Sequence, residues 1–195
     1  MTVQVDPADH PPGTRFLAYA PEQMSVVIDA MVRQAASLLI GQDKVAIIGV
    51  LRRGAPLAEW LTHGLIERFQ LPPPLRLDLK VKRYSDDLKL LHPETQLTVS
   101  AGQTDLDLSG YTLLVVDDVL YTGHSLLRVI EWLNAKLPRA IYTAVLADRH
   151  VAKLPIHADV VGVHLQVAPL DVVECHVPPY EPLLQIELLR LDHDV

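Results

Sequence analysis

Short apolar runs recur along the 195-residue chain and predict the strands of a parallel sheet. Aliphatic and β-branched residues without polar interruption are typical of strands that are buried on both faces. Residues 75–82 instead alternate apolar and charged side chains, which is the period of a strand with one exposed face, and residues 183–191 are expected to supply a final strand. The uninterrupted runs occupy residues 45–50, 113–116, 140–147 and 159–163.

Helical spacing separates these runs. Apolar residues recur on one helix face over residues 24–39, 57–65 and 126–133, and Gly41 stands where the first of these helices would end. Strands that alternate with helices favour an α/β fold, with a central, mostly parallel sheet and helices on both of its faces.

Two segments show neither the strand pattern nor the helical spacing of apolar residues. Residues 1–21 hold several prolines, and we interpret them as an N-terminal arm that precedes a single domain over residues 22–195. Residues 83–107 are rich in charge, and a connection of that length inside a compact domain is typical of a functional lid. No internal repeat and no break in composition indicates a second domain.

Composition excludes some classes of function. The net charge of -7 and the aromatic content of 5% argue against a surface devoted to nucleic acid. No apolar run is long enough to span a bilayer, and the polar, proline-bearing start does not resemble a secretion signal. The single Cys175 cannot form an internal disulfide, which agrees with a reducing, cytoplasmic compartment.

The candidate chemistry lies after the apolar run at residues 113–116. Asp117 and Asp118 follow it directly, and Thr122-Gly123 leads into the third helix. Ligands of open α/β sheets bind beyond the carboxyl ends of the strands. The simplest interpretation is a strand end marked by common turn residues. A second interpretation, the metal-binding strand of a nucleotide hydrolase, requires a G-x-x-x-x-G-K-[ST] loop, and the chain has none.

A third interpretation is a sugar-phosphate site. Gly123 lets backbone N–H groups turn inward, and Thr122 and Ser125 add hydroxyls at the positive end of a helix, which suits a phosphate ester. Asp117 and Asp118 can accept hydrogen bonds from two vicinal hydroxyls. A phosphate cradle beside paired carboxylates describes a site for ribose 5-phosphate.

The stretch LLVVDDVLYTGHS, residues 113–125, resembles the signature of the type I phosphoribosyltransferases. The chain resembles more narrowly the family of pyrimidine-operon attenuators and uracil phosphoribosyltransferases. Three more motifs carry this resemblance: IIGVLRRGAPLAEWL at 47–61, RYSDDL at 83–88 and LADRHVAKLPIHADVVG at 146–162. It implies the single-domain type I fold with a mobile lid at about 83–107 and a small hood, and transfer of ribose 5-phosphate from phosphoribosyl diphosphate to uracil.

The resemblance also implies roles for individual residues. Asp117, Asp118 and Arg53 would be catalytic, and Mg2+ would enter with the diphosphate near the two aspartates, with no direct protein ligand assigned. The 5-phosphate would be held by Val119, Leu120, Tyr121, Thr122, Gly123, His124 and Ser125. The diphosphate would be held by Arg52, Arg53 and Gly54. The lid contacts would come from Arg83, Asp86 and Asp87, and the residues facing the base would be Arg149 and Val161.

The chain departs from the family pattern at three positions of these motifs. Arg52 stands where the family usually has a small hydroxylated residue. Ser85 stands where family members carry a lid arginine, and His124 replaces an arginine beside the 5-phosphate. Tyr121 is similar to the uracil-type proteins, since purine-specific relatives have an acid there. Two alternatives stay open: a UMP-sensing, RNA-binding regulator of pyrimidine genes with little catalysis, and a transferase for another base. Weak RNA binding and a homodimer or larger homo-oligomer are expected.

Overall fold

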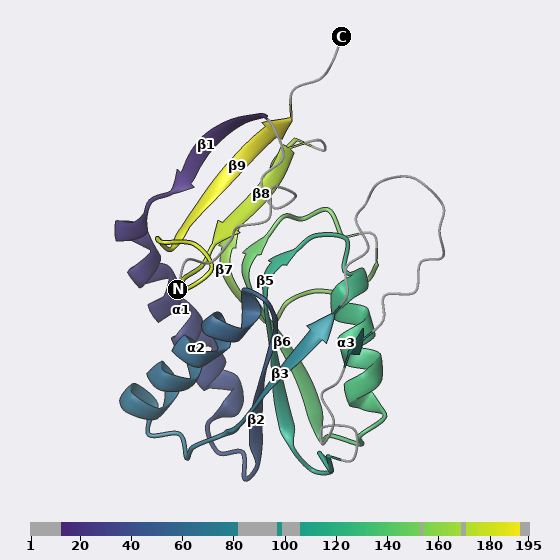
Figure 1. The fold of residues 1–195 in the computed structure, drawn as a ribbon. Coiled ribbons are helices and arrows are strands. Elements are labelled where there is room, and N and C mark those ends of the chain that lie inside the picture. The colour runs from purple at the N-terminus through teal and green to yellow at the C-terminus, as the bar shows by residue number, and fades with distance from the viewer. Residues whose placement is uncertain (1–12, 82–96, 99–105, 153, 169–170, 192–195) are drawn as a thin grey trace.

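The computed structural model describes residues 13–81, 97–98, 106–152, 154–168 and 171–191 of the chain (Figure 1). The three lid residues Arg83, Asp86 and Asp87 lie outside the described residues, so their expected role stays a prediction. The elements are β1 (Gly13–Tyr19), α1 (Pro21–Leu39), β2 (Val45–Leu51), α2 (Gly54–Phe69), β3 (Leu75–Val81), β4 (Leu97–Thr98), β5 (Thr112–Leu120), α3 (His124–Asn134), β6 (Ala140–Asp148), β7 (Val160–His164), β8 (Asp171–His176) and β9 (Gln185–Leu191).

The main sheet of the described chain has six strands in the order β4-β3-β2-β5-β6-β7. Strands β3, β2, β5, β6 and β7 run parallel, and only the two-residue β4 is antiparallel to its neighbour. In register, Ile48 lies opposite Val115, and Val115 lies opposite Thr143. All the carboxyl ends of the parallel strands therefore meet at one edge of the sheet, as the sequence predicts.

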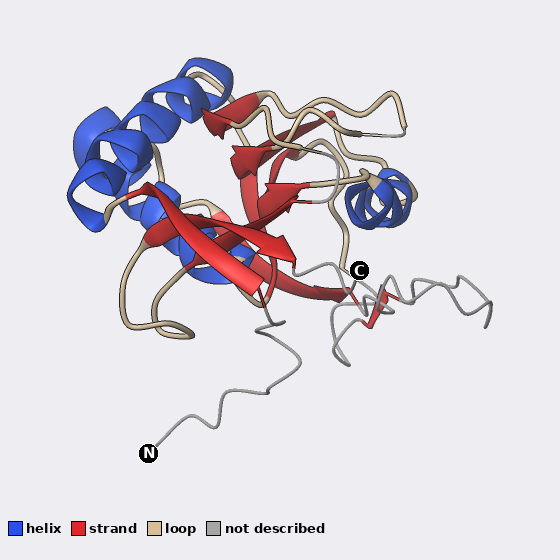
Figure 2. Ribbon diagram, turned by 90° about the horizontal axis from the view of Figure 1, so that it is seen from above, coloured by secondary structure: helices blue, strands red, loops and turns tan. Residues whose placement is uncertain are grey.

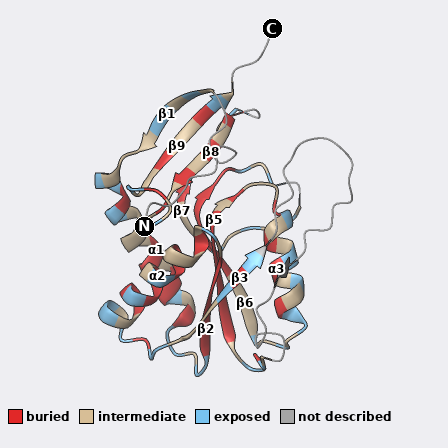
Figure 3. Cartoon of the chain, in the orientation of Figure 1, coloured by how far each residue is buried: buried red, intermediate tan, exposed pale blue. Residues whose placement is uncertain are grey.

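Helices cover both faces of this sheet. In Figure 2, α1 and α2 lie on one side of the strands and α3 lies on the other. Alternate strand residues separate two hydrophobic cores, because Ile47 and Val116 pack under α1 and α2, whereas Ile48 and Val115 pack under α3. Figure 3 shows the central strands β2 and β5 as mostly buried. The predicted α/β fold is confirmed.

A smaller antiparallel sheet, β1-β9-β8, stands above the carboxyl edge of the main sheet and forms a hood (Figure 1). Sequence analysis missed β1, which falls inside the segment interpreted as an arm. This edge strand leaves Phe16 and Leu17 exposed, by 47% and 56%, so its apolar residues do not alternate. Strand β8 was also missed, and β9 begins at Gln185 rather than at residue 183.

No helix in the described part of the chain is both long and apolar enough to cross a membrane.

Candidate active site

Strand β5 extends further than its apolar run predicts, and this corrects the expected position of the two aspartates. Asp117 and Asp118 lie within the strand and are 4% and 5% exposed. Pairing with β6 continues past them, with Val119 opposite Ala147 and Leu120 opposite Asp148. A strand can carry buried carboxylates to this depth when hydrogen bonds and a nearby cation stabilise them. The paired carboxylates therefore belong to the rigid sheet rather than to a loop.

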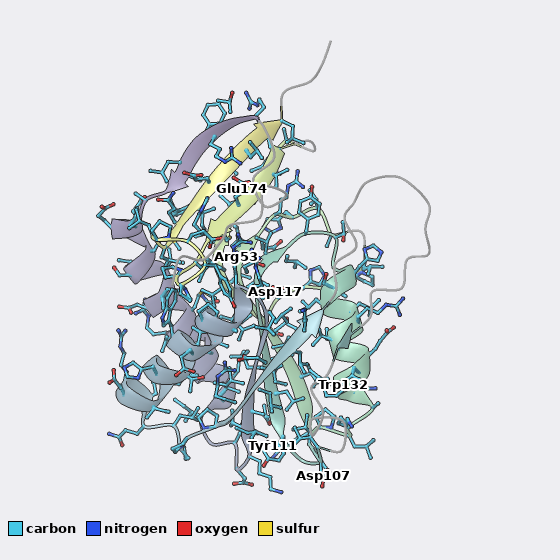
Figure 4. The ribbon with its side chains drawn as sticks, in the orientation of Figure 1. Arg53, Asp107, Tyr111, Asp117, Trp132 and Glu174 are labelled. Carbon is cyan, nitrogen blue, oxygen red and sulfur yellow. The ribbon has the colours of Figure 1, made fainter. Side chains whose placement is uncertain are left out.

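Each of the two carboxylates lies near a polar group that stabilises its charge. Asp117 Oδ1 accepts a hydrogen bond of 2.9 Å from the backbone N–H of Asp118. Asp118 Oδ2 lies 4.0 Å from Nη1 of Arg53, which precedes the first residue of α2. Figure 4 shows Arg53 and Asp117 together at the carboxyl edge under the hood, while Asp107 and Tyr111 lie at the far end of the sheet. The structure thus brings the three predicted catalytic residues to one place.

Gly54 makes this convergence possible. A Cβ atom on Gly54 would lie 2.3 Å from the carbonyl oxygen of Val116 and 3.1 Å from Cα of Asp117. Both neighbours are backbone atoms of β5, so they cannot rotate away. From the sequence, Gly54 is expected to help hold the diphosphate. In the structure, Gly54 allows α2 to approach closely the strand that carries the aspartates.

The two arginines of this loop contact a turn of the hood that sequence analysis did not identify. Arg53 donates hydrogen bonds through Nε to the carboxylate of Glu181 at 3.1 and 3.2 Å, and through Nη2 to the same group. Arg52, whose peptide bond with Leu51 is cis, places its guanidinium 5.4 Å from the ring centre of Tyr180. No motif marks Tyr180 or Glu181, because their partners Arg52 and Arg53 lie 128 residues earlier in the chain.

Glu181 is held as a buried carboxylate. Burial by itself would raise its pKa, but the hydrogen bonds from Arg53 and from the backbone N–H of Val177 outweigh that effect and lower the pKa. The side chain of Glu181 is 7% exposed and that of Arg53 is 22% exposed. Glu181 therefore stays ionised at neutral pH and fixes Arg53 beside Asp118.

The loop after β5 has the geometry of an anion cradle. Gly123 precedes α3 with φ of 87°, a conformation that favours glycine, and its carbonyl accepts the N–H of Leu127. The helix begins at His124, whose Nδ1 lies 2.9 Å from the hydroxyl oxygen of Thr122. The first-turn N–H groups of α3 point out of its amino end, where they favour an anion. Ser125 lies in this same first turn.

Val119 and Leu120 differ from the other residues expected to hold phosphate. They lie in the β5–β6 ladder, and their side chains pack against the two hydrophobic cores. The residues that remain at the amino end of α3 are those from Tyr121 to Ser125.

Arg149 supports this loop from the end of β6. Its side chain is almost fully buried, its guanidinium carbon lies 4.4 Å from the ring centre of Tyr121, and Nη2 donates to the carbonyl of Ala168. Val161, the other expected base-side residue, pairs through its backbone with the amide of Gln34 and packs in the core under α3. The structure thus brings Arg149 to the loop between β5 and α3, while Val161 lies in the edge strand β7.

Two hollows of the described surface lie away from the aspartates. One of about 340 Å³ is formed by the segments before β2 and β3, at the opposite end of the sheet from Asp117. Another, of about 610 Å³, lies between α1 and β7. Neither hollow is lined by the aspartates, and the site at the carboxyl edge is identified by its side chains and backbone groups.

The family model of the phosphoribosyl transferase domain matches residues 20–181. Among curated relatives, the bifunctional protein PyrR of Actinobacillus pleuropneumoniae (serotype 5b, strain L20) is 30% identical over 170 residues, which cover 87% of this chain and 93% of the relative. The bifunctional protein PyrR of Roseiflexus sp. (strain RS-1) is 38% identical over 138 residues, or 69% and 73% of the two chains.

Solved structures give the same fold. Hypoxanthine phosphoribosyltransferase from Trypanosoma cruzi, in complex with the product IMP, aligns with a TM-score of 0.70 at 18% identity, covering 93% of this chain and 92% of that one. A second structure of the Trypanosoma cruzi enzyme aligns with a TM-score of 0.72 at 19% identity. The comparisons confirm the family resemblance and the fold predicted from the motifs.

Proposed function

Because the chain belongs to the phosphoribosyl transferase domain family, and within it to the family of the bifunctional PyrR proteins, we propose that it transfers ribose 5-phosphate from phosphoribosyl diphosphate to uracil. The products would be UMP and diphosphate. The observation that carries this proposal is the meeting of Arg53, Asp118 and the phosphate-cradle geometry of residues 121–125 at one edge of the sheet.

The aspartates would orient the ribose. Asp117 and Asp118 are fixed in β5 and can accept hydrogen bonds from its two vicinal hydroxyls. The amino end of α3, with Thr122 and Ser125, would bind the 5-phosphate on the far side of the sugar. Holding both ends of the sugar fixes its anomeric carbon, which removes much of the entropic cost of bringing base and sugar together.

The diphosphate would lie toward the loop between β2 and α2. Arg52 and Arg53 supply guanidinium groups there, and guanidinium groups match phosphate oxygens in charge and geometry. As a ring nitrogen of the base bonds to the anomeric carbon and releases its proton to solvent, the bond from that carbon to the diphosphate oxygen breaks, and the arginines would stabilise the departing charge. Glu181 would keep Arg53 in position for this role.

The side chains also fit the Mg2+ that the family is expected to use. Asp117 and Asp118 offer carboxylate oxygens, the ligands that Mg2+ prefers, next to the expected diphosphate. When bound, Mg2+ would neutralise part of the charge on the diphosphate.

Uracil is proposed as the base because the chain's relatives are PyrR proteins and because Tyr121 stands at the position where purine-type relatives carry an acid. The buried Arg149 supports the Tyr121 ring and would fix its position beside the base.

A base screen tests this proposal. The full chain is incubated with phosphoribosyl diphosphate and uracil, cytosine, hypoxanthine, guanine or orotate, with Mg2+ or with excess chelator, and the nucleotides formed are separated and measured. We expect UMP from uracil only when Mg2+ is present. Formation of IMP or GMP in preference to UMP would show a purine enzyme, and no nucleotide from any base would overturn the catalytic proposal.

A further inference from the structure

A group of ligating side chains lies at the carboxyl ends of β6 and β7, outside the residues assigned to the sugar and the diphosphate. Asp148 is the last residue of β6, His164 is the last residue of β7, and His150 follows β6 by two positions. One ligating atom from each side chain lies within 4.8 Å of the others.

The backbone turns His150 back toward this group. Asp148 Oδ1 accepts the N–H of His150 at 2.9 Å, and His150 adopts φ of 56°. Its ring stacks on the His164 ring with centres 4.8 Å apart, and Nε2 of His150 lies 2.8 Å from Nδ1 of His164. Asp148 Oδ2 lies 3.9 Å from Nδ1 of each ring. Two imidazoles and one carboxylate thus converge from three points of the chain.

These three side chains match a known coordination chemistry. Two histidines and a carboxylate, with a fourth position left to water or another ligand, form a common zinc site. Zinc–ligand distances of about 2.0–2.2 Å place neighbouring tetrahedral ligands about 3.3 Å apart. Nδ1 of His164 lies 2.8 Å from Nε2 of His150, below that value, and 3.9 Å from Oδ2 of Asp148, above it. Because an ion binds one nitrogen of each ring, the two stacked imidazoles would have to rotate apart to receive it. The rings of His150 and His164 are 50% and 61% exposed, which leaves room for a fourth ligand.

A second group of similar composition has other partners. Glu174, His176 and Glu187 of the hood also come within 4.8 Å of one another. However, Arg15 donates to both oxygens of Glu174, at 2.8 and 3.2 Å, and Gln185 donates to Glu187. Arg15 therefore already balances carboxylate charge in this hood group, where a metal ion would otherwise be needed to do so. The hood group of Glu174, His176 and Glu187 therefore serves as a control for the group of Asp148, His150 and His164.

We propose that Asp148, His150 and His164 bind a divalent transition-metal ion of the zinc class. This site is separate from that of the Mg2+ expected with the diphosphate, because imidazole nitrogen suits zinc and Mg2+ prefers oxygen. The ion would join β6 to the edge strand β7. Since Arg149 lies between two of the ligands, the ion would also fix the segment that supports Tyr121.

Calorimetric titration with Zn2+ tests the proposal. The untagged full chain, stripped of metal and held in excess Mg2+ to occupy oxygen-rich sites, is titrated with Zn2+ alone. We expect one tight site for each chain, and we expect Asp148→Asn, His150→Ala and His164→Ala each to weaken it by more than about tenfold. Substituted Co2+ should give the visible absorption of a four-coordinate ion in the unaltered chain and lose it in these variants.

Two histidine variants serve as matched controls. His63→Ala removes an exposed histidine that pairs with Glu67 on α2, and His176→Ala disrupts the hood group. Both should keep the tight site. His150 and His164 are exposed, so their alanine variants should fold, which a thermal melt checks. Unchanged zinc affinity in those two variants, or a loss in His176→Ala as large as theirs, would overturn the proposal.

Discussion

The contact between Arg53 and Glu181 is the individual interaction on which the proposed site depends most. It joins the loop after β2 to the hood and positions the guanidinium beside Asp118. The sequence motif predicts Arg53 as a ligand-binding residue but gives no sign of its carboxylate partner. The partner matters because a diphosphate would approach an arginine that is already oriented, rather than one that must be ordered on binding.

Glu181→Gln should remove most of this pairing without changing the volume of the side chain. We expect a loss of about 1.5–3 kcal/mol in the free energy of unfolding at neutral pH, since the lost hydrogen bonds involve two charged groups. The folded-state pKa of Glu181 is lowered, so its stabilisation is present above the ordinary carboxyl pKa of about 4.3 and is lost as the pH falls through the lowered value. The difference between the two proteins should therefore shrink in acid.

Urea denaturation of both proteins, at neutral pH and at a pH of about 3, measures this difference. Glu59→Gln is the matched control, because Glu59 is exposed and lies 3.5 Å from Arg76, and it should change stability by less than about 1 kcal/mol. An equal destabilisation by Glu181→Gln at both pH values would show that the ion pair is not its source.

Among the elements, those of the main sheet follow from local pattern. Continuous apolar runs predict β2, β6 and β7 within a few residues, because strands buried on both faces need apolar side chains at every position. The same pattern predicts that β5 ends at Val116, four residues before its observed end, because the sequence does not show that Arg53, which lies just before α2, is near Asp118 in space. Strand β1 escapes the rule because it is an edge strand that exposes Phe16 and Leu17. Neighbours distant in sequence decide each of these exceptions.

The packing of α2 against β5 gives a prediction for this layer of the structure. Gly54→Ala should destabilise the fold by about 1–3 kcal/mol, because the new Cβ would overlap the backbone of Val116. Gly64→Ala in the same helix is the comparison, since its Cβ would lie 2.7 and 3.0 Å from the two methyl groups of buried Val32, which are side-chain atoms and so can shift more than the backbone of β5 can. Thermal melts of both variants should show the larger loss for Gly54→Ala, and a larger loss for Gly64→Ala would contradict this assignment.

The charge of the whole chain bears on the alternative of an RNA-binding regulator. The net charge of -7 repels a phosphate backbone, and Arg33 is the one Lys or Arg residue within α1. We expect weak binding to a pyrimidine-leader RNA hairpin, with little change of affinity between low and physiological salt, because few counterions would be released. Fluorescence anisotropy with and without UMP measures this. Tight, UMP-enhanced binding at physiological salt would favour the regulator.

The most direct test of the account asks whether the carboxyl edge of the sheet binds the phosphoribosyl group. Phosphoribosyl diphosphate with Mg2+ is titrated calorimetrically into the unaltered chain, into Asp118→Asn, and into Asp107→Asn, which makes the same change at the opposite end of the sheet (Figure 4). We predict one site in the unaltered chain, affinity lower by about tenfold or more in Asp118→Asn, and no change in Asp107→Asn. Affinity that is absent in all three proteins, or equal in all three, would contradict the account.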